Sequence, residues 1–133
     1  ELRAEGSRLA RECGPPARTG ADCGGMGLGV DARRARDVAC AVTDSVWWYF
    51  DVDCRGASVV PGRGWPEPGG FLPREVLKFS QLIAARPLAG IEVVECSPPY
   101  DNAEITALIA TRVICDTLGC LVRAGHPPRK APP

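Results

Sequence analysis

The chain has 133 residues and a mass of 14.1 kDa, and its 16 Lys and Arg residues balance 16 Asp and Glu residues. This length suits one domain. A formal net charge of zero argues against nucleic acid or an anionic membrane surface as the partner. No apolar run approaches the roughly 20 residues of a membrane span, and no cationic and apolar leader opens the chain. We therefore expect a soluble globular protein.

Seven cysteines are spread along the chain without a CxxC pair, and the only histidine is His126, in a Pro-rich tail. Structural zinc needs clustered thiolates or imidazoles, so this spacing argues against a zinc site. An odd number of thiols favours a reducing compartment, and we expect a cytoplasmic location.

The N-terminal part of the chain predicts two helices. Apolar residues at helical spacing run from Leu2 to Cys13, where Gly and Pro follow. The Gly-rich segment from Thr19 to Val30 is predicted to be a loop. Asp31 then caps a helix that runs to about Val42.

The middle and the C-terminal part predict two strands and two helices. The short apolar run Val46–Phe50 is typical of a strand covered on both faces, so Trp47 and Trp48 are expected in the core rather than in a cation-binding pocket. The further predicted elements are a helix from Pro73 to about Ala85, a strand at Ile91–Cys96 and a helix from Ala103 to Leu118 that Gly119 ends.

The alternation of helices and strands predicts an α/β fold with a mostly parallel sheet. We place the domain at residues 1–120 and assign residues 121–133 to a Pro-rich disordered tail.

Acidic residues end both predicted strands, where open parallel sheets bind their ligands. Asp51 and Asp53 are two residues apart, so strand alternation places both carboxylates on one face. Two oxygen ligands at a strand end suit Mn or Mg, and turn-forming aspartates are the alternative. Glu95 ends the second strand, and it is either solvated or binds a cation, a metal or a guanidinium group.

Several motifs together resemble the C-terminal half of the ureohydrolases, the arginase and agmatinase family. They are Phe50-Asp51-Val52-Asp53, the loop Pro61–Gly70, Arg74-Glu75 and the segment Val93–Thr106. The order and the spacing agree from about Val46 to Leu118. The segment from Glu95 to Thr106 is more similar to agmatinases and related guanidino-acid hydrolases than to arginases.

The resemblance implies a three-layer α/β/α fold with a mostly parallel sheet, of which this chain is the C-terminal half. It also implies a binuclear manganese centre that hydrolyses a guanidino compound to an amine and urea through a metal-bridging hydroxide. In this family, enzymes are usually homo-oligomers.

The resemblance also implies roles for single residues. Asp51 and Asp53 match the family's manganese ligands, and Glu95 matches the catalytic acid that binds the substrate guanidinium. Thr106 matches a supporting residue. In the loop that rims the site, Trp65 is a candidate substrate contact, whereas Arg63 is expected to be solvated.

The chain departs from the family pattern in three respects. Gly56-Ala57 stand where Asp-Pro is expected, and Tyr49 replaces a Ser. The stretches Gly-Gly-Asp-His and Asp-x-His-x-Asp, which supply the other metal ligands, are absent. Two carboxylates alone bind a metal pair weakly, so we expect the isolated chain to be inactive. The alternatives are a truncated non-catalytic paralogue or fragment and a metal-binding module without hydrolysis.

Overall fold

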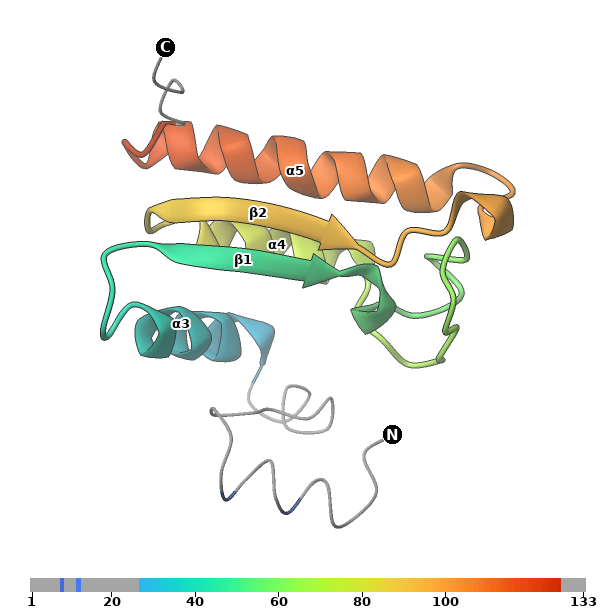
Figure 1. Ribbon diagram of the computed structural model, residues 1–133, viewed down its shortest axis with the longest axis horizontal. Helices are drawn as coiled ribbons and strands as arrows, with labels where there is room; N and C mark the ends of the chain where they lie inside the picture. Colours follow the sequence, from blue (N-terminus) through green and yellow to red (C-terminus); the bar gives the residue numbers. More distant parts are fainter. Residues whose placement is uncertain (1–7, 9–11, 13–26, 128–133) are drawn as a thin grey trace.

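The computed structural model describes residues 8, 12 and 27–127, and in this part helices and strands alternate (Figure 1). The predicted helix from Leu2 to Cys13 and the predicted loop from Thr19 to Val30 lie almost wholly outside the described residues up to residue 26, as does the end of the tail. The described end of that loop was predicted wrongly, because Leu28–Val30 form the first turn of α3 and Asp31 lies inside the helix instead of capping it. The described elements are α3 (Leu28–Ala39), β1 (Val46–Asp51), the 3-10 turn η1 (Val52–Cys54), α4 (Pro73–Ile83), β2 (Leu88–Val94), the 3-10 turn η2 (Pro98–Tyr100) and α5 (Ile105–Arg123).

β1 and β2 form a parallel sheet of two strands in this part of the chain, and α4 connects them. Trp48 pairs with Ile91 and Asp51 with Val94, so both strands end at the same edge of the sheet. In Figure 1, α3 lies beside β1, α5 lies beside β2, and α4 lies behind the two strands. The predicted α/β fold with a parallel sheet is confirmed.

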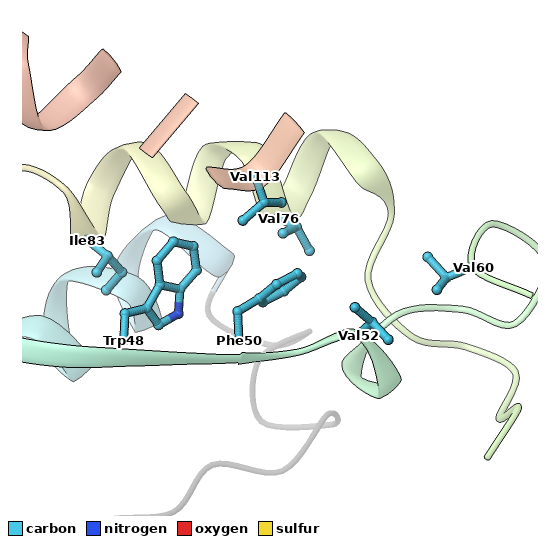
Figure 2. Close-up of a cluster of buried hydrophobic side chains, with 7 residues drawn as sticks. All are labelled: Trp48, Phe50, Val52, Val60, Val76, Ile83 and Val113. Atoms are coloured by element: carbon cyan, nitrogen blue, oxygen red, sulfur yellow. The ribbon is translucent and has the colours of Figure 1, made fainter. Parts of the chain in front are cut away.

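The side chains of β1 alternate between a buried face and an open face. Trp48 and Phe50 are buried with their ring centroids 5.7 Å apart, and they pack against Val76 of α4 and Val113 of α5 (Figure 2). The complete cluster of buried hydrophobic residues is Trp48, Phe50, Val52, Val60, Val76, Ile83 and Val113. Burial of these side chains supplies the hydrophobic free energy that holds the helices on the sheet.

The open face of β1 contradicts one expectation. Trp47 and Tyr49 are 62% and 56% exposed, so the prediction that β1 is covered on both faces is wrong within the described residues. The core of this part of the chain lies on the Trp48 face alone. On the open face, Trp47 lies over Gly90, and its Nε1 donates a hydrogen bond of 3.3 Å to Glu92.

The helix ends follow the local rules only in part. As predicted, α4 begins at Pro73, and the preceding amide of Leu72 donates to the Glu75 carboxylate at 2.7 Å. The prediction that Gly119 ends α5 is wrong, because the helix continues to Arg123 and therefore also includes the first residues of the predicted tail. A glycine on the exposed side of a helix costs only about 1 kcal/mol, which the burial of Leu121 offsets.

α5 is also long and apolar enough to cross a membrane, judged by length and composition alone. The sequence analysis found no such run because Arg112 and Asp116 interrupt it. The core helices of globular proteins pass the same test, and α5 buries Thr106, Val113 and Leu121. This length and composition are therefore weak support for a membrane span.

Candidate active site at the end of the parallel sheet

Asp51 and Asp53 remain close together, although not by the geometry that their spacing predicted. Asp51 is the last residue of β1, whereas Asp53 lies in η1, so strand alternation does not place the two carboxylates on one face. Instead the Asp51 carboxylate caps the turn and accepts a hydrogen bond of 2.8 Å from the amide of Asp53. Burial and the charge of Asp51 raise the pKa of Asp53, and the opposite charge of Arg63 offsets part of this effect.

Arg63 is buried, with 2% exposure, and the expectation that it is solvated is wrong. Its guanidinium group donates to the backbone carbonyls of Asp53 at 2.8 Å, Arg55 at 2.6 Å and Glu67 at 2.8 Å. Its Nε lies 3.9 Å from Oδ1 of Asp53. Arg63 therefore connects the rim loop to the turn that carries Asp53, because one planar group with several donors satisfies three carbonyls.

Glu95 follows directly after β2, next to the acidic pair. Val94 is the register partner of Asp51, and Glu95 lies one residue further toward the same edge. The strand was predicted to continue to Cys96, but Glu95 has a φ of 64°, a left-handed conformation that ends the strand and is rare for residues other than glycine. The exposed Glu95 carboxylate thus leaves the sheet where β1 presents Asp51.

The electrostatics of the open face connect these acids. Partial burial raises the pKa of Tyr49, and the charges of Asp51, Glu92 and Glu95 raise it further. Tyr49 and Asp51 are two residues apart in β1, so their side chains lie on the same side of the strand. The end of the open face is therefore acidic.

Thr106 connects the start of α5 to the rim loop, and its supporting role at the site stays a prediction. It is buried, and its Oγ1 accepts a hydrogen bond of 2.8 Å from the amide of Gly62 in the rim loop. The carbonyl of Gly62 in turn accepts from the amide of Ser97 at 2.8 Å. Asp101 caps α5 by accepting from the amides of Thr106 at 3.1 Å and Ala107 at 3.0 Å. The rim loop, the exit of β2 and the start of α5 are therefore held together.

Trp65 lies in the rim loop and is 70% exposed. Within the described residues, its ring makes no aromatic contact and no hydrogen bond with the acidic pair. The structure therefore leaves its expected substrate contact a prediction.

Arg55 is a further buried cation that the sequence analysis did not single out. Its side chain is fully buried, and none of its guanidinium nitrogens has a hydrogen-bond partner among the described residues. Burial lowers the pKa of Arg55. No local sequence pattern singled it out, since its neighbours Asp53 and Cys54 are half-buried and exposed.

The acidic pair fits a metal ion as part of a larger donor set. Oδ1 of Asp53 is buried and accepts no hydrogen bond in this part of the chain, although Nε of Arg63 lies 3.9 Å away as an opposite charge. Carboxylate oxygens are ligands that Mn accepts. However, residues 27–127 contain no group of three or more His, Cys, Asp or Glu residues that could hold a metal ion. Further donors are needed for tight binding.

The comparison with known proteins identifies the class. The chain matches the Arginase family model over residues 2–119 and belongs to this family. It is 41% identical over 96 residues to an agmatinase of Chromobacterium violaceum, a match that covers 71% of this chain and 29% of that protein. It is 37% identical over 79 residues to proclavaminate amidinohydrolase of Streptomyces clavuligerus, which covers 59% of this chain and 25% of that protein.

Solved structures agree with the fold. Proclavaminate amidinohydrolase of Streptomyces clavuligerus has a TM-score of 0.78 at 33% identity, covering 87% of this chain and 38% of that one. Formimidoylglutamase of Bacillus subtilis has a TM-score of 0.84 at 26% identity, covering 91% of this chain and 38% of that one. The chain therefore spans less than half of the length of these relatives.

Proposed function

We propose that this chain supplies part of the active site of a manganese-dependent ureohydrolase of the agmatinase type, which converts a guanidino compound to an amine and urea. One observation carries the proposal. In a chain of the arginase family, Asp51, Asp53 and Glu95 come together at one end of a parallel sheet.

In this proposal, Asp51 and Asp53 would hold manganese. Their Oδ1 atoms face the turn and Arg63, while their Oδ2 atoms have no hydrogen bond within the described residues. Manganese, when bound, lowers the pKa of a coordinated water enough for it to act as a nucleophile near neutral pH.

Glu95 would bind the substrate. A carboxylate accepts two parallel hydrogen bonds from a guanidinium group, and this contact fixes the plane of the group that reacts. The left-handed backbone of Glu95 ends the strand at this residue, and the network of Thr106, Gly62 and Ser97 holds this segment against the rim loop. In addition to its two metal ligands, this chain would thus supply the group that orients the substrate.

A chimaera tests the proposal, because this chain lacks the length of its relatives. The chain replaces the matching segment of the Chromobacterium violaceum agmatinase, and urea release from agmatine is measured with added Mn. We expect urea release, and we expect Glu95→Gln to reduce it roughly 100-fold because the guanidinium loses its ionic partner. Asp37→Asn, an exposed charge removal on α3, is the control. A folded, manganese-loaded chimaera without urea release would contradict the proposal.

The alternative is a non-catalytic fragment or a metal-binding module without hydrolysis. The lack of a third donor near the acidic pair in residues 27–127 favours the non-catalytic fragment over the metal-binding module. Calorimetric titration separates the cases. Tight binding of Mn by the isolated chain, together with an inactive chimaera, would indicate a binding module.

A further inference from the structure

Arg63 is a charged residue of the rim loop that is closed off from solvent. Its side chain is fully buried, and the residue as a whole is 2% exposed. Ionised side chains are almost never buried unless a partner compensates their charge. Arg63 therefore acts on the site through the groups that it touches and not by direct contact with a substrate.

The guanidinium group of Arg63 binds the backbone on both arms of the loop that follows Asp53. Its Nη1 donates to the carbonyl oxygens of Asp53 and Arg55, and its Nη2 donates to the carbonyl oxygen of Glu67. The carbonyl of Glu67 also accepts a hydrogen bond of 3.0 Å from the amide of Ala57. One planar cation thus fixes the backbone at the end of η1 relative to the opposite arm of the loop.

The polar atoms that remain in this contact belong to one ion pair. Nε of Arg63 and Oδ1 of Asp53 are both buried, neither has a hydrogen-bond partner among the described residues, and they lie 3.9 Å apart. The Asp53 side chain is nevertheless 26% exposed, so its exposed part lies on the side of Oδ2. The ion pair therefore determines which oxygen of Asp53 stays available to a ligand.

The turn after Asp53 also lacks residues that the family pattern has. Gly56 and Ala57 stand where Asp-Pro is expected, so neither a carboxylate nor a proline ring constrains the backbone there. Arg63 supplies a constraint at this place, since it binds the carbonyl of Arg55, the residue directly before Gly56.

We propose that Arg63 is a positioning residue for Asp53, an inference that rests on the assignment of Asp53 as a metal ligand in the proposed function. The guanidinium group holds the turn through three carbonyls and orients the Asp53 carboxylate so that Oδ2 stays free for manganese. Its positive charge by itself repels a metal ion, whereas the orientation of Asp53 favours metal binding. Removal of Arg63 therefore weakens Mn binding if positioning dominates and strengthens it if Arg63 acts as a charge alone.

Calorimetric titration of the chimaera with Mn tests this role. Arg63→Lys keeps the charge but loses the planar fork, and Arg63→Met keeps much of the length without any charge or donor. We expect both variants to bind Mn at least roughly tenfold more weakly than the parent, as is usual when a residue that orients a metal ligand is replaced. At saturating Mn, the KM for agmatine should equal that of the parent, because Glu95 is unchanged.

A readout without metal checks the same contact. The amide of Asp53 donates to the Asp51 carboxylate, and its hydrogen exchange in the metal-free chain reports on the order of the turn. We expect this amide to exchange faster in both Arg63 variants than in the parent.

Arg55→Leu is the matched control for both measurements. It removes a second buried guanidinium group two residues from Asp53, which has no hydrogen-bond partner among the described residues. Since its loss leaves the contacts of Arg63 through the Arg55 backbone in place, Arg55→Leu should weaken neither Mn binding nor the protection of the Asp53 amide.

Three results would overturn the inference. One is a Mn affinity in either Arg63 variant that equals or exceeds that of the parent, and another is an equal loss of affinity in Arg55→Leu. The third is loss of the circular dichroism spectrum of the folded protein in both Arg63 variants, which would assign Arg63 to the stability of the fold alone. A parent chimaera that binds Mn but releases no urea contradicts only the proposed function, whereas one that binds no Mn contradicts both.

Discussion

Two buried arginines near Asp53 differ in how the protein compensates their charge. Arg63 satisfies three backbone carbonyls and lies close to the Asp53 carboxylate. Arg55 is just as buried but has no hydrogen-bond partner among the described residues. A buried guanidinium without partners loses its hydration and gains nothing in return. At the residue scale, Arg63 therefore organises the site, whereas we expect Arg55 to lower the stability of the folded protein.

We expect Arg55→Leu to raise the free energy of unfolding by roughly 1–3 kcal/mol, because an apolar side chain removes the desolvation cost of the cation. Urea denaturation followed by circular dichroism measures the change. Arg34→Leu on the exposed side of α3 is the control and should stay within about 0.5 kcal/mol of the parent. A loss of stability in Arg55→Leu would show that the guanidinium has a partner.

The helix elements show how local signals and packing compete. Asp101 stabilises the start of α5, because its carboxylate accepts hydrogen bonds from two amides of the first turn that have no partner within the helix. Gly119 is a poor end signal, because it lies on the exposed side of a helix that Thr117 and Leu121 hold by burial. The left-handed Gly125, with a φ of 82°, stands beyond the observed end of the helix at Arg123.

Gly119 and Gly125 form a matched pair for substitution. Gly119→Ala should stabilise the chain by about 0.5–1 kcal/mol, because a helical backbone and open space around the added Cβ suit alanine. Gly125→Ala should destabilise it, because alanine is strained at positive φ. Thermal unfolding of both variants checks the opposite signs. Equal shifts of the Tm in the two variants would mean that α5 ends earlier than Arg123.

The cap of α5 depends on pH. Burial acts to raise the pKa of Asp101, but hydrogen bonds from Ala107 and Thr106 outweigh it and hold the pKa below 3.8. A lowered folded-state pKa means that the carboxylate contributes stability above pH 3.8 and loses this contribution as the pH falls through the folded pKa. Asp101→Asn should therefore be less stable than the parent near neutral pH.

Thermal melting from about pH 7 to about pH 2 measures this dependence. The difference in Tm between the parent and Asp101→Asn should disappear at the acidic end. Asp44→Asn, an exposed aspartate at the other end of the sheet, is the control and should show little difference at any pH. A gap that persists at about pH 2 would assign the effect to something other than the carboxylate charge.

At the scale of the whole molecule, the described part of the chain is a sheet of two strands with one covered face, and both strands are edge strands in this part. Asp51, Asp53 and Glu95 follow the ends of the two strands at the same edge of the sheet. A metal ion held by two carboxylates alone binds weakly, so a complete site depends on what covers this side of the chain. The proposed function therefore predicts that metal binding and completion of the fold are coupled.

We expect Mn to raise the Tm of the chimaera and a chelator to reverse the rise, because a ligand that binds only the folded state stabilises it. The isolated chain should show a much smaller response at the same Mn concentration. Differential scanning calorimetry with and without the chelator compares the two. An equal rise in both would mean that Asp51 and Asp53 hold the metal with donors from this chain alone.

The family and the fold were predictable from the sequence, because they depend on residue identity and spacing. The motifs around Asp51, Asp53, Glu95 and Thr106 predicted the family, which the match over residues 2–119 confirmed. The alternation of helices and strands predicted a parallel sheet, and Pro73 marked the start of α4. Local chemistry determines these features, so a linear pattern carries them.

Only the tertiary structure decided which surfaces meet. It left Trp47 exposed, buried Arg63 against three carbonyls, and turned Glu95 out of the strand by a left-handed backbone. It also brought Asp51 and Asp53 together through a turn instead of a strand. Burial and backbone conformation at these positions depend on neighbours that are distant in the chain. The order of the residues alone therefore determined the family and most of the helices and strands. Packing determined which charged side chains of the protein are buried and which lie close together.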